Sequence, residues 1–156
     1  MNVKEIHVDR LKPDPENPRR HSDRNMKAIT ASLEEHGLVS PLIVQKSSMM
    51  VIGGNARLQA LKRLGYSEVS CAIIDVDDKA ARKLSISLNR SGELATWNED
   101  TLAKHLNYFS ELEDDLTSLG FSDEEFERLA ANFEDVDLAE FMPDEDESSE
   151  ESEDER

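Results

Sequence analysis

The chain has 156 residues, 34% of them charged and 5% aromatic, which suits one domain of ordinary size with a modest hydrophobic core. The net charge of -17 is unevenly distributed: residues 1–90 hold 15 Lys and Arg against 11 Asp and Glu, whereas residues 91–156 hold 3 against 24. An apolar run of about 18 residues and the apolar stretch of a signal peptide are both absent from the sequence. The single cysteine, Cys71, excludes an internal disulfide, and the cytosol is the expected location.

The first part of the chain predicts a compact α/β arrangement. A strand over 3–11 leads into a loop that is extended by its three prolines, Pro13, Pro15 and Pro18. Ser22 is a good N-cap for a helix that ends at Gly37. The further elements expected are strands over 41–45 and 49–52, a helix capped by Asn55 and ended by Gly65, a strand over 69–74, and a helix from Asp77 or Asp78 to about Leu88.

The second part predicts helices only. Asn98 is expected to cap a helix whose apolar face carries Leu102, Leu106 and Phe109. Ser122 and Glu125 have the spacing of a capping box, and Phe121 and Phe126 occupy the positions of a hydrophobic staple. This last helix is expected to end near Phe133.

From residue 134 onward, 13 of 23 residues are acidic and only Arg156 is basic. Such a segment cannot bury apolar surface, so we expect it to be disordered. The fold class is therefore α/β (α+β), a small mixed sheet with helices. Three regions follow: a domain over 1–97, a helical extension over 98–133 and a disordered acidic tail over 134–156.

The strongest local pattern is a strand, a glycine pair and a helix, formed by Gly53, Gly54, Asn55, Ala56 and Arg57. Glycines let the backbone approach a ligand, and the free N–H groups of the first helical turn can bind an anion. Arg57 lies in that turn, where a guanidinium can bind phosphate. The alternative is a tight turn with a capped helix and a solvated arginine, and the Walker spacing is absent.

Two further basic segments are weaker signals. Asn17, Arg19 and Arg20 lie on the proline loop, and Asn89 with Arg90 lies at the expected end of a helix. The alternative for the first segment is a solvated basic loop, and the alternative for the second is a favourable interaction of Arg90 with the helix dipole. The four scattered histidines lack metal-ligand spacing, and Cys71 within an apolar strand is expected to be a core thiol.

In order and spacing, these three segments together resemble the N-terminal domain of the ParB/sulfiredoxin superfamily over about residues 3–97. The similar segments are Asn17-Pro18-Arg19, the helix end Glu34-Glu35-His36-Gly37, Gly54-Asn55-Ala56-Arg57 and Leu88-Asn89-Arg90. The resemblance implies a site for a nucleoside triphosphate, CTP or ATP, with Mg²⁺. In that site Arg57, Arg19 and Arg90 would neutralise phosphates, and Asn89 would help to bind the metal.

ParB-like regions of phages and mobile elements, often placed ahead of a DNA methyltransferase, are similar to the chain up to about residue 133. The segments that carry this similarity are Gly54 to Ala60, Asn89-Arg90, Trp97-Asn98-Glu99 and Gly120-Phe121-Ser122 through Glu125. This subtype implies that Trp97 packs against the nucleotide domain.

The sequence also departs from the family pattern. Asn55 and Ala56 stand where the CTP-type box has a Glu and an Arg, and no Glu precedes Asn89. The cysteine of the sulfiredoxin box is absent from these positions, and no helix-turn-helix segment follows in the sequence. The resemblance therefore predicts nucleotide binding, without predicting hydrolysis, sulfinic-acid reduction or reading of a parS-type DNA site.

Three functions remain open at this stage. The first is a nucleotide-dependent switch that acts on DNA or a DNA-associated protein. Two copies of the chain could form a homodimer in such a switch. The second is a small ATP-dependent kinase or a nuclease, for which Glu16 and Glu93 are the candidate carboxylates. The third is an interaction protein whose acidic tail mimics DNA or covers the domain's own basic surface.

Overall fold

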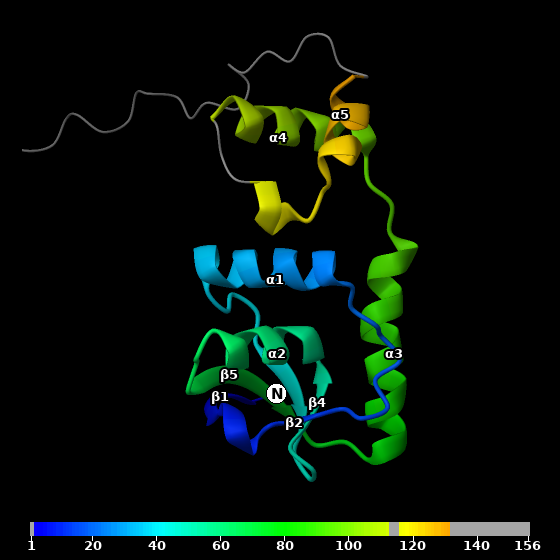
Figure 1. The fold of residues 1–156 in the computed structure, drawn as a ribbon. Helices are drawn as coiled ribbons and strands as arrows, with labels where there is room; N and C mark the ends of the chain where they lie inside the picture. Colours follow the sequence, from blue (N-terminus) through cyan, green and yellow to red (C-terminus); the bar gives the residue numbers. More distant parts are fainter. Residues whose placement is uncertain (1, 113–115, 132–156) are drawn as a thin grey trace, which may run out of the picture.

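The computed structural model describes residues 2–112 and 116–131, and it contains one mixed sheet with helices stacked above it (Figure 1). The sheet order is β1-β5-β3-β4-β2. The strands are β1 (Asn2–His7), β2 (Lys12–Pro13), β3 (Leu42–Gln45), β4 (Met50–Gly53) and β5 (Glu68–Ile74). The helices are η1 (Val8–Arg10), α1 (Asp23–His36), α2 (Asn55–Arg63), α3 (Asp78–Leu94), α4 (Glu99–Glu111), η2 (Leu116–Leu119) and α5 (Asp123–Ala130).

The sheet contains both kinds of strand pairing. β1 pairs with β5 and β3 with β4 in antiparallel fashion, whereas β3 with β5 and β2 with β4 are parallel. Pro13 lies in the short edge strand β2, where its missing N–H costs no central hydrogen bond. The expected α/β fold with a mixed sheet is confirmed.

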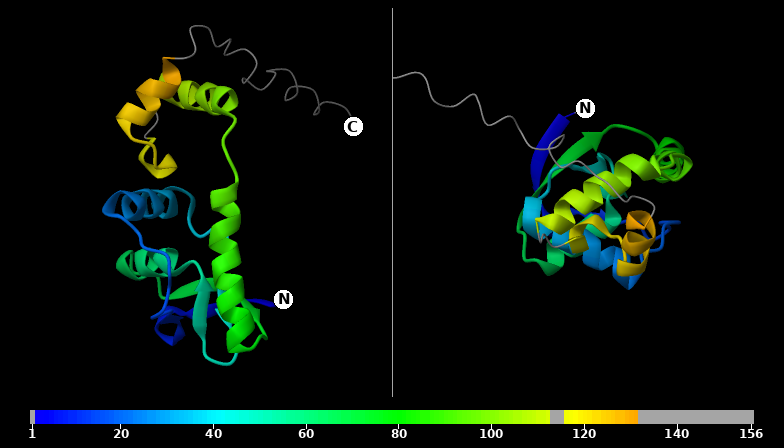
Figure 2. Two further views of the ribbon diagram at one scale, coloured as in Figure 1. Left: turned by 90° about the vertical axis from the view of Figure 1, so that its right-hand side faces the viewer. Right: turned by 90° about the horizontal axis from the view of Figure 1, so that it is seen from above.

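The helices form layers above the sheet, with α2 nearest to it, then α1, then the extension made of η2, α4 and α5 (Figure 1). α3 runs upright beside these layers and connects the sheet region to the extension (Figure 2). A large buried cluster joins sheet, α1 and α2 through residues such as Leu33, Leu42 and Leu61. A second, smaller cluster joins α4 to α5 through Ala103, Leu106 and Leu129.

Most helix boundaries follow from capping chemistry that the sequence displays. The Ser22 hydroxyl accepts the Asn25 N–H at 3.2 Å, and Gly37 ends α1 with a φ of 69°. Asn98 caps α4, and Ser122 with Glu125 forms the expected capping box of α5. In the described ranges, no helix has the length and apolarity needed to cross a membrane.

Several expectations are corrected. The first strand ends at His7, because Val8 turns into a short 3-10 helix and is buried there. α3 continues six residues beyond Leu88, so Asn89 lies inside a helix and not at its end. The last helix ends at Ala130, whereas Phe133 and the predicted tail over 134–156 lie outside the described residues.

Trp97 also differs from expectation. Its side chain is 70% exposed, and its ring contacts Phe121 of the extension edge to face, at 6.3 Å between centroids. The tryptophan therefore joins the α3–α4 connection to the residue before α5, and the expected packing against the sheet domain is wrong.

Candidate functional site

The turn between β4 and α2 requires a glycine at position 54. Gly54 is the N-cap residue of α2 and has a left-handed φ of 96°. A Cβ at this position would lie 2.7 Å from Cδ2 of the buried Leu42. The backbone of the turn therefore packs directly on the core, and the first N–H groups of α2 have no acceptor within the helix.

Asn55 has a different role from the one expected, because the residue that caps α2 is Gly54. The Asn55 Oδ1 accepts the backbone N–H of Asp14 at 2.9 Å, and its Nδ2 donates to the Val51 carbonyl at 2.9 Å. One amide thus connects β4, the start of α2 and the proline loop. It fixes the loop beside the helix N-terminus.

Arg57 lies partly buried beside the glycine turn. Its Nη1 donates to the Ser40 carbonyl at 2.6 Å, and its Nη2 lies 3.0 Å from the position that a Cβ of Gly54 would take. Burial lowers the pKa of the Arg57 guanidinium. Arginine nevertheless stays charged at neutral pH, so this cation faces the N-terminus of α2 with a neutral carbonyl as its partner.

The proline loop brings a second cation to the same place. The Asn17 Oδ1 accepts the Arg19 N–H at 3.1 Å, which forms a local Asx-type turn. The Arg19 guanidinium forms an ion pair with Glu93 of α3. Arg90, one turn earlier in α3, donates to the other oxygen of Glu93 at 3.0 Å.

These segments meet at a pocket of about 260 Å³, called the site pocket below. It is lined by Asn17, Arg19, His21, Ile29, Ile52, Gly54, Asn55, Ala56, Arg57 and Asn89. The structure thus brings together seven of the ten predicted residues from three separate segments. Gly53, Arg20 and Arg90 do not line it, and Arg20 is exposed on the loop.

Three lining residues had no signal in the sequence: His21, Ile29 and Ile52. His21 precedes the N-cap of α1, and its Nδ1 lies 2.7 Å from the Asn25 Oδ1. A wider hollow of about 440 Å³ shares Asn17, Arg19, His21, Asn55 and Ala56 and extends along α2 to Gln59 and Lys62. The shared residues make one continuous groove with a third cation, Lys62, at its far end.

Asn89 was also predicted to bind a metal. Its Nδ2 donates to the Ser85 carbonyl at 2.8 Å, so its Oδ1 is the atom that could act as a ligand. Within residues 2–112 and 116–131, no group of three or more His, Cys, Asp or Glu side chains is arranged to hold a metal ion. A Mg²⁺ ion carried by phosphates usually takes one or two carboxylates from the protein. Asn89 would offer a neutral amide oxygen in their place.

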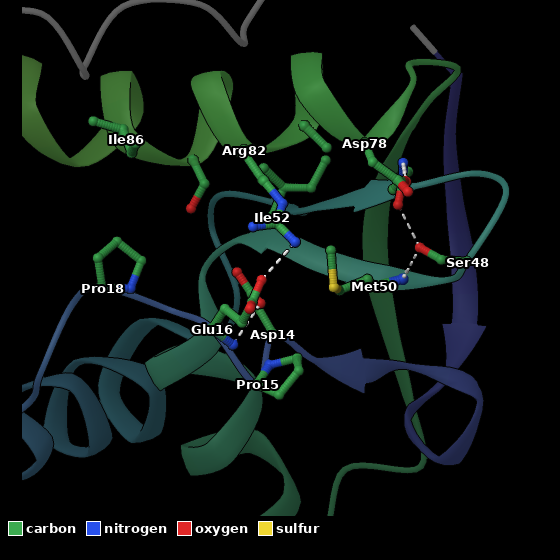
Figure 3. A pocket seen from close by; sticks show the side chains of 13 residues that line it. Asp14, Pro15, Glu16, Pro18, Ser48, Met50, Ile52, Asp78, Arg82 and Ile86 are labelled. Carbon is green, nitrogen blue, oxygen red and sulfur yellow. Dashed lines mark hydrogen bonds and ion pairs between the residues drawn. The ribbon is translucent and has the colours of Figure 1, made fainter.

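A neighbouring pocket of about 430 Å³ lies on the other side of the proline loop, between the β3–β4 hairpin and the first half of α3 (Figure 3). The Arg82 Nη2 and the Glu16 Oε2 form an ion pair at 2.6 Å across it. Asp14, Glu16 and Asp78 bring three carboxylates against the one guanidinium of Arg82. This negative lining sets the neighbouring pocket apart from the cationic site pocket.

Residues 1–90 match the ParB N-terminal domain. The chain belongs to this family. A probable chromosome-partitioning protein ParB from Campylobacter jejuni is 34% identical over 87 residues, which are 54% of this chain and 31% of that protein. Stage 0 sporulation protein J from Bacillus subtilis is 31% identical over 117 residues, 70% of this chain and 42% of that protein. The chain thus spans less than half the length of both relatives.

The fold is also similar to a solved structure of the ParB family. A C-terminally truncated chromosome-partitioning protein ParB from Caulobacter crescentus, complexed with CTP-gamma-S, gives a TM-score of 0.68 at 20% identity. The similarity covers 93% of this chain and 82% of that one. It therefore includes the helical extension, which lies beyond the matched family domain.

Proposed function

We propose that this chain is a ParB-like nucleotide-binding module that acts in a DNA-associated process. The observation that carries the proposal is the meeting of Arg57, Arg19 and Asn89 at the N-terminus of α2. Two supports come from similar proteins. The sequence relatives are partitioning and sporulation proteins, and the structural relative was solved with a CTP analogue.

The site pocket suits phosphate groups for a physical reason. Arg57 and the first residues of α2 line the same pocket, and Arg19 lines it from the loop. The N-terminus of a helix and two guanidinium groups both favour an anion. Lys62 adds positive charge farther along the groove. The nucleotide proposed is CTP or ATP, with Mg²⁺ on its phosphates and the Asn89 Oδ1 as a protein ligand.

Both carboxylates considered for catalysis already have arginine partners. Glu16 pairs with Arg82 at 2.6 Å in the neighbouring pocket, and Glu93 pairs with Arg19 and Arg90. Each carboxylate would have to leave its arginine partner before it could accept a proton from a substrate. We therefore propose binding and a nucleotide-dependent switch, and we assign no kinase or nuclease chemistry.

Calorimetry with CTP, ATP and GTP in the presence of Mg²⁺ tests the proposal. Arg57→Ala should weaken binding about tenfold to hundredfold, since a charge-assisted hydrogen bond contributes about 1.5–3 kcal/mol. Arg63→Ala is the matched control, because Arg63 is exposed on the same helix and lies outside both hollows. Absence of nucleotide binding by the wild-type protein would refute the proposal.

The partners proposed are DNA or a DNA-associated protein, together with a second copy of the chain in a homodimer. The phage and mobile-element subtype rests on the motifs around Trp97 and Gly120. For the acidic tail, truncation after Phe133 is the direct experiment. Stronger, salt-sensitive DNA binding by the truncated chain would support a tail that covers a basic surface, and unchanged binding would favour a tail that only adds charge.

A further inference from the structure

Glu93 in α3 pairs with two arginines at the edge of the proposed site. Its Oε1 pairs with Arg19 Nη1, and its Oε2 accepts from Arg90 Nη1 at 3.0 Å. Arg19 lines the site pocket and belongs to the proline loop, whereas Arg90 belongs to α3 itself. The positive charge that the loop brings to the site is therefore compensated from within the protein.

The two site arginines consequently differ in the charge of their partners. Arg57 donates to the Ser40 carbonyl, a neutral acceptor, so its positive charge stays available to an anionic ligand. Arg19 instead faces a carboxylate. A phosphate that approaches Arg19 has to displace Glu93 or share the guanidinium with it, and the two negative charges repel each other.

The ion pair is weak enough to be exchanged. The side chains of Arg19 and Glu93 are 43% and 40% exposed, and that of Arg90 is 61% exposed. Ion pairs with this much solvent contribute little to stability, because water competes for both partners. A polyphosphate offers several charged oxygens at once and can replace one carboxylate.

We propose that Glu93 is an internal counter-ion that occupies Arg19 in the ligand-free protein and lowers the affinity of the site for anions. The identity of the ligand rests on the proposed function, whereas the Glu93 contact does not. The competition sets a threshold: only a ligand with enough charge to displace the carboxylate gains the contribution of Arg19. Displacement also breaks one of the two ion pairs that connect the proline loop to α3, and the Glu16–Arg82 pair remains.

The test compares Glu93→Gln with Glu16→Gln in the full chain. Both variants remove one negative charge, and both break an ion pair between the proline loop and α3, so long-range electrostatics and loop tethering are matched. Of these two glutamates, Glu93 contacts an arginine that lines the site pocket, whereas Glu16 contacts Arg82, which does not line it. Calorimetry with CTP and with inorganic tripolyphosphate then measures the affinity of each protein.

Glu93→Gln should bind both ligands about fivefold more tightly, the ratio that corresponds to one partly exposed ion pair. Glu16→Gln should stay within about twofold of wild type. The affinity of Glu93→Gln should also fall more steeply with salt, because a solution anion that must be released replaces the tethered carboxylate on Arg19. A purely structural role of Glu93 would not change this slope in that direction.

Weaker or unchanged binding by Glu93→Gln would overturn the proposal, because Glu93 would then orient the arginines and not compete for them. Absence of tripolyphosphate binding by both wild type and Glu93→Gln would overturn it too. If tripolyphosphate binds and CTP and ATP do not, the nucleotide function fails, and the role of Glu93 is still decided by the tripolyphosphate affinities.

Discussion

Replacing Gly54 by alanine should damage both the stability of the fold and the proposed site. The φ of 96° is left-handed, which costs a residue with a Cβ about 1–2 kcal/mol. The new Cβ would also lie 2.7 Å from Leu42 Cδ2, and Leu42 is fully buried, so relief requires movement of the core. Overpacking of this kind costs about 1–3 kcal/mol, which gives a total loss of about 2–5 kcal/mol.

Gly65→Ala is the matched control for this experiment. Gly65 has a similar φ of 81°, but an added Cβ there meets no atom within 4 Å. This variant should therefore lose only the backbone contribution of about 1–2 kcal/mol. Urea denaturation of both variants, compared at unchanged m-value, measures the difference. Equal losses in the two variants would refute the reasoning, because the contact with Leu42 would then cost nothing.

Two further outcomes are expected. Burial in β5 and, to a smaller extent, repulsion from Glu5 raise the pKa of the Cys71 thiol to about 11. An alkylating reagent at a pH of about 8 should therefore modify Cys71 only after denaturant is added. Rapid labelling of the native protein would contradict this expectation. The hydrogen bond from the Ser122 backbone, and then that from Arg24, lowers the pKa of Glu125. Because the folded value is the lower one, its contribution to stability is present above the ordinary value of 4.5 and is lost as the pH falls through the folded value. The single tryptophan, Trp97, contacts Phe121, so its fluorescence should report the loss of stability at low pH. If Glu125→Gln loses stability with falling pH in the same way, Glu125 is not the group responsible.

Local chemistry explains why so much of the fold could be predicted. Ser22, Asn98 and Ser122 cap their helices with side-chain oxygens that reach only a few residues along the chain, so the sequence alone displays them. The glycine turn and the basic segments were likewise visible as patterns. Their meeting in one pocket became an expectation only through the family resemblance, because periodicity does not place segments relative to one another.

The errors come from contacts between distant parts of the chain. Asn55 is a good capping residue by type, but its amide bonds to Asp14 and Val51, and Gly54 with its left-handed φ is the N-cap. α3 continues through Gly92, a residue that usually weakens helices, and the last turns of α3 carry the ion pairs of Glu93. Neither Arg19 nor Glu93 reveals this partnership by its local sequence.

The contact between α1 and the segment before α5 bears on how the chain should be shortened for laboratory work. Arg24 of α1 donates to the Gly120 carbonyl at 2.6 Å and 3.1 Å and pairs with Glu125, and a Cβ at Gly120 would come within 3.3 Å of Ala28. A chain cut at residue 97 would therefore expose to solvent the side of α1 that these contacts cover, and the exposed side could cause aggregation. A chain cut after α5 keeps that side covered, and we expect it to be the more soluble of the two fragments.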